Sequence, residues 1–217
     1  MGKIEKSSGS ISVIGGSDGP TSVFIAGRSK KTFKQRLQKQ FFQLRKKWCA
    51  LWIKPGAHTM EAVVAYAKNT YGFEELSKDD KEYIEQYEEL RTSFIMMHRP
   101  KLLREYAAAP KLKSHDEAGI MEFQKQLELR RQKAKEISED TFSIDFHVLK
   151  KKDKKGTMNL YLEGRFGSIS GGWSSRGKRS GREFKRIYKD IYRYFGVTEE
   201  DIARKTERYQ DLVRTLA

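Results

Sequence analysis

The densest group of side chains that could do chemistry in this sequence is a run of cations between residues 176 and 193. Guanidinium and ammonium groups at this density bind the phosphates of a polyanion. Glycine and serine surround the first of them, so an anion can approach the backbone closely beside the positive end of the following helix. We expect a phosphate-binding surface made by Arg176, Lys178, Arg179, Arg182, Lys185, Arg186, Lys189 and Arg193.

Two other basic segments could contribute to the same surface. No acidic residue lies between Gly19 and Met60, and ten basic residues fall between Arg28 and Lys54. If six to ten phosphates are contacted, affinity should fall by about 10³–10⁵ between 50 and 200 mM salt. A cationic helix face that is only solvated stays open as the alternative. The further residues assigned to the surface are Lys30, Lys31, Arg36, Lys39, Arg45, Lys46 and Lys47, together with Lys150, Lys151 and Lys152 near a hairpin tip.

The three tryptophans carry different expectations. Trp173 lies among glycine and serine, so it could stack on an exposed base or anchor the core of a sheet, and the sequence leaves both open. Trp48 and Trp52 belong to an apolar stripe with helical spacing. We expect these two rings to be buried.

No catalytic constellation stands out. The four histidines are far apart, none has the spacing that places two metal ligands on one helix face, and a metal site or cofactor is not expected. The single cysteine, Cys49, is expected to be a buried thiol. A metal-dependent nuclease built on Asp145, Glu163 and Glu183 is the main enzymatic alternative. We expect a protein that is not an enzyme.

Composition bounds the class of protein. The chain has 217 residues and a net charge of +15. Residues 1–72 contain thirteen Lys or Arg and three acids, residues 73–140 contain thirteen and sixteen, and residues 141–217 contain eighteen and ten. The excess of positive charge is therefore at the two ends of the chain. A charge of this size attracts nucleic acid, anionic membrane or acidic proteins. One cysteine fits a reducing compartment, and no apolar run approaches the ~20 residues of a membrane span. We expect a cytoplasmic protein without transmembrane association.

The elements that position these residues follow from turn and period signals. Alternating apolar residues on either side of Asp18 and Gly19 predict an N-terminal β-hairpin. A helix should span residues 31–53, with its apolar stripe in the core. Further helices are expected at 60–71, from Ser77 to 97, and from a Ser114 capping box to about 138.

The C-terminal third predicts a second hairpin. Residues 142–148 and 158–162 alternate as strands, a basic segment from Lys150 to Gly156 forms the turn, and 166–175 extends the sheet. Helices should follow at 182–195 and from Thr198 to the end. We expect one α+β domain over 1–217, with possible subdivisions at 1–56, 57–140 and 141–217. Its antiparallel sheet should include both hairpins and be covered by about five helices.

The opening stretch VIGGSDGPTSVFIAGR resembles a known signature. It is similar to the Gly-Gly-x-Asp-Gly-Pro-Thr motif of the β subunits of sodium-ion-translocating decarboxylases, over about sixteen residues. The resemblance implies a role for Asp18 in sodium and proton handling. The chain lacks the membrane spans of that family, so ion pumping by this chain is rejected. The motif instead reads as a turn, which could also bind an anion, formed by Gly15, Gly16, Asp18, Gly19, Pro20 and Thr21.

These observations predict a basic nucleic-acid-binding protein without catalytic activity. RNA or single strands are favoured over duplex reading, because no helix-turn-helix or zinc-finger pattern occurs while aromatics and Gly/Ser loops suit stacking and backbone contacts. An interaction factor or inhibitor that docks on an acidic or nucleic-acid-binding protein is the alternative. Peripheral attachment to anionic membrane, with Trp48 and Trp52 facing lipid, is a further one.

Overall fold

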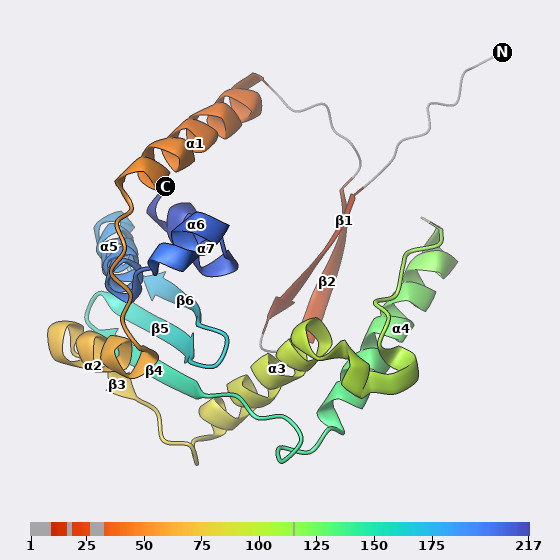
Figure 1. The fold of residues 1–217 in the computed structure, drawn as a ribbon. Helices are drawn as coiled ribbons and strands as arrows, with labels where there is room; N and C mark the ends of the chain where they lie inside the picture. Colours follow the sequence, from red (N-terminus) through yellow and green to blue (C-terminus); the bar gives the residue numbers. More distant parts are fainter. Residues whose placement is uncertain (1–9, 17–18, 27–32, 115) are drawn as a thin grey trace. The chain divides into compact units, whose positions relative to one another are not determined.

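The computed structural model describes residues 10–16, 19–26, 33–114 and 116–217, and for residues 10–26 and 35–36 it describes the backbone alone. The chain forms two compact units (Figure 1). One combines the described part of residues 1–31 with Ile84–Ser143, and the other combines residues 32–83 with Ile144–Ala217.

Six strands and eight helices are described. The strands are β1 (Ser10–Gly16), β2 (Gly19–Ala26), β3 (Glu74–Glu75), β4 (Phe146–Asp153), β5 (Gly156–Glu163) and β6 (Ser168–Ser175). The helices are α1 (Phe33–Trp52), α2 (Met60–Tyr71), α3 (Lys81–His98), the 3-10 helix η1 (Pro100–Tyr106), α4 (Glu117–Lys135), α5 (Lys178–Phe195), α6 (Glu199–Arg204) and α7 (Glu207–Leu216).

The larger sheet belongs to the second unit and is antiparallel in the order β3-β4-β5-β6. Leu149 of β4 pairs with Leu160 of β5, so both side chains share one face. On β6, Trp173 pairs with Met158 and therefore also belongs to that face. The predicted α+β class with an antiparallel sheet is confirmed.

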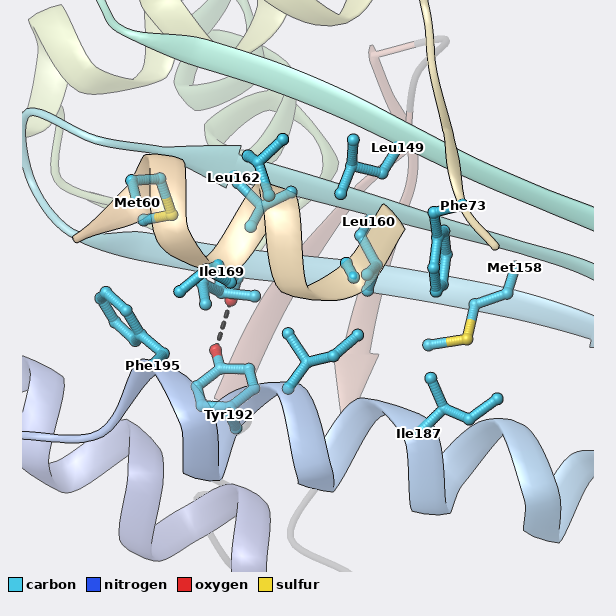
Figure 2. Packing of buried hydrophobic residues seen from close by; sticks show 14 of the residues in the cluster. Met60, Phe73, Leu149, Met158, Leu160, Leu162, Ile169, Ile187, Tyr192 and Phe195 are labelled. Atoms are coloured by element: carbon cyan, nitrogen blue, oxygen red, sulfur yellow. Dashed lines mark hydrogen bonds between the residues drawn. The ribbon is translucent and has the colours of Figure 1, made fainter. Parts of the chain in front are cut away.

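Helices α2 and α5 cover this face and form the core with it (Figure 2). Leu160, Leu162 and Ile191 are fully buried in the cluster. Tyr192 is also buried, and its hydroxyl donates a hydrogen bond to the Ile169 carbonyl, which ties α5 to β6. Because the cluster draws on both helices and three strands, α5 is held in one rotational setting about its axis.

The expectation that the N-terminal hairpin joins this sheet is wrong. Strands β1 and β2 form their own two-stranded antiparallel sheet, with a register shift between Ile14 and Gly15. Gly16 pairs with Gly19, which confirms a tight hairpin around the motif, while Asp18 lies outside the described residues. The alternating pattern predicts strand pairing within the hairpin, but it carries no information on which other strands the hairpin meets.

Several boundaries differ from the predicted ones for local reasons. The predicted strand at 142–148 begins only at Phe146, because Arg91 donates to the Phe142 carbonyl at 2.7 Å and fixes the preceding segment. Lys150 to Asp153 belong to β4, so the hairpin turn is only residues 154–155. Asp116, and not Ser114, caps α4, with its carboxylate 2.8 Å from the Gly119 amide.

The C-terminal helix is two helices. Thr198 and Asp201 form a capping box at the start of α6. The chain then adopts a left-handed conformation at Lys205, and the Thr206 side chain caps α7. Together with η1, this break raises the helix count above the expected five.

Two buried arginines hold together the helical part of the first unit. Arg130 of α4 donates to the carbonyls of Met96, Tyr106 and Ala107. Arg91 of α3 donates to the carbonyls of Ile137 and Phe142. Backbone carbonyls accept the hydrogen bonds of both guanidinium groups. These two arginines therefore hold segments of the unit together, and neither is available to an external anion.

Candidate nucleic-acid interface

Helix α5 presents seven cations along one side, which we call the α5 ridge. Its opposite side is fixed by the core, where Phe184, Ile187, Ile191 and Phe195 are buried. At 100° per residue the cations fall within one arc of about 120° that faces away from these residues. All but one of them are exposed, and Lys189 is half-buried. The ridge consists of Lys178, Arg179, Arg182, Lys185, Arg186, Lys189 and Arg193.

The cations of the ridge have no ion pair with any residue that the structure describes. The two acids of α5 lie at its flank and have other partners. Glu183 pairs with Lys155 at 2.6 Å. Asp190 accepts hydrogen bonds from the hydroxyls of Tyr66 and Tyr71, both at 2.7 Å. Lys189 donates a hydrogen bond to the Leu216 carbonyl at 2.7 Å, so its ammonium is partly used within the chain. The six exposed cations of the ridge have no such partner among the described residues and can face an external anion.

The C-terminal half of α1 approaches the ridge. Burial lowers the pKa of Lys189, and the charges of Lys185 and then Arg45 lower it further, so Arg45 of α1 contributes to the same positive field. A pocket of about 380 Å³ is lined by Trp48, Trp52 and Lys54 together with Arg193 of α5. Two basic segments separated by more than a hundred residues thus meet on one unit.

The other predicted cations of α1 have varied positions. Lys39 and Lys47 are exposed, while Lys46 is half-buried with its ammonium 6.0 Å from the centre of the Phe42 ring. Lys30 and Lys31 lie outside the described residues, and of Arg36 only the backbone is described.

The lysines of the second hairpin are mostly used within the chain. Lys150 donates to Glu82 at 2.6 Å, and Lys151 donates to the Tyr71 carbonyl at 2.8 Å. Lys152 is exposed. Since a paired ammonium adds little attraction for an external phosphate, Lys150 and Lys151 differ from the six exposed cations of the ridge in what they can bind.

Helix α5 begins four residues earlier than predicted, which changes the setting of the first cations. Gly177 is the N-cap, so Lys178 and Arg179 lie in the first helical turn and only Arg176 remains in the loop. This turn contains no acid, and no side chain caps its backbone N–H groups. The helix dipole and the three cations therefore act in the same direction on an anion.

Trp173 lies beside this end of α5. Its ring is 6.0 Å from that of Tyr188, and 37% of the residue is exposed. A Cβ at Gly181 would be 3.0 Å from the Ser175 hydroxyl oxygen, so glycine at this position lets α5 pack closely against β6. Trp173 thus has a packed side against Tyr188 and an open side.

The expectation that Trp48 and Trp52 are buried is wrong. They are 65% and 68% exposed, and the apolar stripe of α1 is exposed with them. Figure 1 shows α1 extending beyond α5, α6 and α7, with its C-terminal end near them. Cys49, on the side nearer these helices, is half-buried and not fully buried. The helical spacing of the apolar residues predicted the helix correctly. It did not predict that α1 extends beyond the helices that could cover its apolar side.

The carboxylates of the nuclease alternative have structural partners. Glu163 is buried and accepts from the backbone N–H groups of Asp145, Arg165 and Phe166. Glu183 of α5 is paired with Lys155 of the turn between β4 and β5. Among the described residues, no group of three or more His, Cys, Asp or Glu side chains is placed to hold a metal ion.

A cluster at the flank of the ridge was missed from the sequence. The Tyr66 ring stacks on Tyr194, with the ring centres 4.0 Å apart, and meets Tyr71 edge-on at 6.0 Å. His58 stacks on the other face of Tyr194, also at 4.0 Å. The hydrogen bond to Asp190 and then burial raise the pKa of Tyr66. Tyr66 and Asp190 are 124 residues apart, so no local pattern could have predicted this cluster.

Comparisons of the chain with protein-family models, with curated proteins and with solved structures return no match. Within the described part of the chain, none of the helices combines the length and the apolarity needed to span a bilayer. The function must therefore be argued from the surface itself.

Proposed function

We propose that this protein binds single-stranded nucleic acid, with RNA favoured, through the α5 ridge and without catalysing a reaction on it. The observation that supports this most strongly is the ridge itself: seven cations in one arc, with no ion pair to a described residue, beside acids that are used elsewhere. A row of this kind matches the regular spacing of backbone phosphates.

Arg176 and Arg45 extend the ridge at its two ends. Arg176 precedes the N-cap of α5, and the charge of Arg45 lowers the pKa of Lys189 in the C-terminal half of α5. The 18 residues of α5 are about 27 Å long at 1.5 Å per residue. This length accommodates several nucleotides of an extended strand.

The preference for single strands comes from Trp173. Its partly open ring lies beside α5, and its indole nitrogen is 3.9 Å from where a Cβ would lie at Gly181 in the first turn. A base next to a phosphate bound there can stack on it. Stacking of this kind contributes about 1–3 kcal/mol per base and accepts any base. A paired base inside a duplex does not offer its face in this way, so the ring gains nothing from duplex binding.

Filter binding of the full chain to a 20-nucleotide single-stranded RNA, the matching DNA and their duplexes tests the proposal. We expect retention of the single strands at 50 mM salt. Trp173→Ala should weaken binding of single strands by about tenfold or more and leave duplex binding almost unchanged, because stacking is lost while the cations remain. Absence of retention for all probes at 50 mM salt would overturn the proposal.

A further inference from the structure

Helix α1 carries an apolar face that no described part of the chain covers and that the nucleic-acid proposal does not use. Seven large apolar residues follow one side of the helix, and each is between 41% and 81% exposed. On the side toward α7, Cys49 and Ile53 are half-buried and line a pocket with Leu212 and Leu216, and Trp48 and Trp52 reach the same pocket from the edge of the exposed side. We call the exposed set the α1 stripe: Phe33, Leu37, Phe41, Leu44, Trp48, Leu51 and Trp52.

The charges beside the stripe restrict what can cover it. Lys34, Lys39, Arg45 and Lys47 lie on the same helix and are exposed, and the sequence has no acid between Gly19 and Met60. A second copy packed along the stripe would bring one basic helix against another, with no acid on either helix to pair with Arg45 or Lys47, and that repulsion disfavours a dimer. The occupant must therefore be apolar at its centre and negatively charged around it.

We infer that the α1 stripe docks on an anionic phospholipid surface, with the helix lying in the plane of the interface. Helices that lie in this way have aromatic and leucine side chains on one face, Lys and Arg on the other, and no net hydrophobic excess. The stripe has four aromatic rings among its seven residues. At 100° per residue Lys39 and Lys46 lie opposite it, while Lys34, Arg45 and Lys47 border it. The helix is about 30 Å long at 1.5 Å per residue. When it lies in the plane of the interface, all seven side chains of the stripe enter the membrane to a similar depth.

The C-terminal end of the stripe adds a feature suited to a lipid. The pocket there combines the apolar side chains of Trp48, Trp52 and Leu216 with the cations Lys54 and Arg193. A phospholipid presents the same combination, an acyl chain next to a phosphate. Tryptophan rings also favour the boundary between headgroups and acyl chains, because they have a large apolar body and one N–H donor.

This inference goes beyond the proposed function and does not depend on it. The experiment is co-sedimentation of the full chain with vesicles of phosphatidylcholine and phosphatidylserine at 7:3, compared with phosphatidylcholine alone. A Trp173→Phe background leaves Trp48 and Trp52 as the only tryptophans, so their fluorescence reports the stripe. We expect binding to the anionic vesicles and a blue shift of the emission.

The matched variants separate the stripe from general charge attraction. Leu44→Ser with Leu51→Ser removes apolar surface without changing charge, and should weaken vesicle binding at least tenfold. Met97→Ser with Met121→Ser, at two exposed methionines outside the stripe, should leave it unchanged. Equal vesicle binding by the stripe variant and the wild type, or no binding of the wild type to anionic vesicles, would overturn the inference.

RNA retention by the same variants tells this inference apart from the proposed function. The stripe variant should retain RNA as well as the wild type does, because it leaves every cation of the α5 ridge unchanged. If the variant instead loses RNA retention while the wild type ignores vesicles, the stripe belongs to a nucleic-acid site and the lipid inference is wrong. Circular dichroism melting checks that both double variants remain folded.

Discussion

Helices α1 and α5 have similar sequences in outline but opposite relations to the rest of the second unit. Both are 18 to 20 residues long, with an apolar stripe and several cations. In α5 the apolar residues are buried in the core, and the cations are left facing solvent. In α1 the apolar residues are themselves exposed. An amphipathic pattern therefore predicts a helix, but it does not say whether the chain itself covers the apolar face.

In our two proposals, this difference gives the two helices different partners. Since α5 has only charge to offer, it suits a polyanion with no apolar surface, such as a nucleic-acid backbone. Helix α1 offers apolar surface bordered by charge, which suits an anionic membrane surface. Variants in and around the two helices, and the salt dependence of binding, test this contrast.

The largest effect is expected from reversing charge on the ridge. Arg179→Glu, Arg182→Glu and Arg186→Glu together should lower the affinity for single-stranded RNA by about 100-fold or more, because attraction to several phosphates becomes repulsion. All three arginines are exposed, so the melting temperature should change little. Filter binding and thermal melting measure the two quantities.

The matched control for this triple variant carries the same change in net charge elsewhere. Lys111→Glu, Lys113→Glu and Lys125→Glu alter exposed lysines of the first unit. This control should lose less than about threefold in RNA affinity, since these three lysines are not part of the ridge. Similar losses in both triple variants would mean that net charge, and not the ridge, governs binding.

The two apolar faces should differ strongly in their effect on stability. Ile191→Ala in α5 removes a fully buried side chain and should lower the free energy of unfolding by about 2–5 kcal/mol. Leu44→Ala in α1, where the residue is 61% exposed, should stay within about 0.5 kcal/mol. Urea denaturation compares them, and an equal loss at both sites would show that the folded chain covers the α1 stripe.

The flank of α5 should matter for stability and not for RNA. Asp190→Ala leaves the hydroxyls of Tyr66 and Tyr71 without their acceptor and should cost about 1–3 kcal/mol. Burial and the hydrogen bond to Asp190 also raise the pKa of Tyr71, so the folded chain keeps a proton that the unfolded chain releases near pH 10.

Because the unfolded chain then binds fewer protons, stability should fall as the pH rises above about 10. The fall should be shallower in Asp190→Ala, where the pKa of both tyrosines moves back toward its ordinary value. Urea midpoints at pH 8, 10 and 11 measure this. Parallel curves for the two proteins would contradict the assigned role of Asp190.

The smallest effect is expected at the second hairpin. Lys150 is already paired with Glu82, so Lys150→Gln should change RNA affinity by less than about twofold. Arg186→Gln, which removes one unpaired ridge cation, should change it more. If Lys150→Gln has the larger effect in filter binding, the distinction between paired and unpaired cations is wrong.

Sequence reasoning succeeded where the signal is local. The bounds of α2 follow from Thr59 and Gly72, which cap it, and the ridge follows from helical spacing alone. It failed where contacts join distant segments. Three features depend on how the elements pack: the hydrogen bonds of Asp190 to its tyrosines, the ion pair of Glu82 with Lys150, and the exposure of the α1 stripe. Neither apolar spacing nor helix-capping residues in the sequence indicate such contacts.

The salt dependence of RNA binding is the sharpest test of the α5 ridge. For a single strand, the logarithm of affinity should fall with the logarithm of salt concentration at a slope of about −0.7 per phosphate contacted. Six contacts by the wild type predict a slope near about −4, and the triple ridge variant should lie at least about 2 closer to zero. A wild-type slope between zero and about −1, or the same slope in both proteins, would contradict a nucleic-acid interface at the ridge.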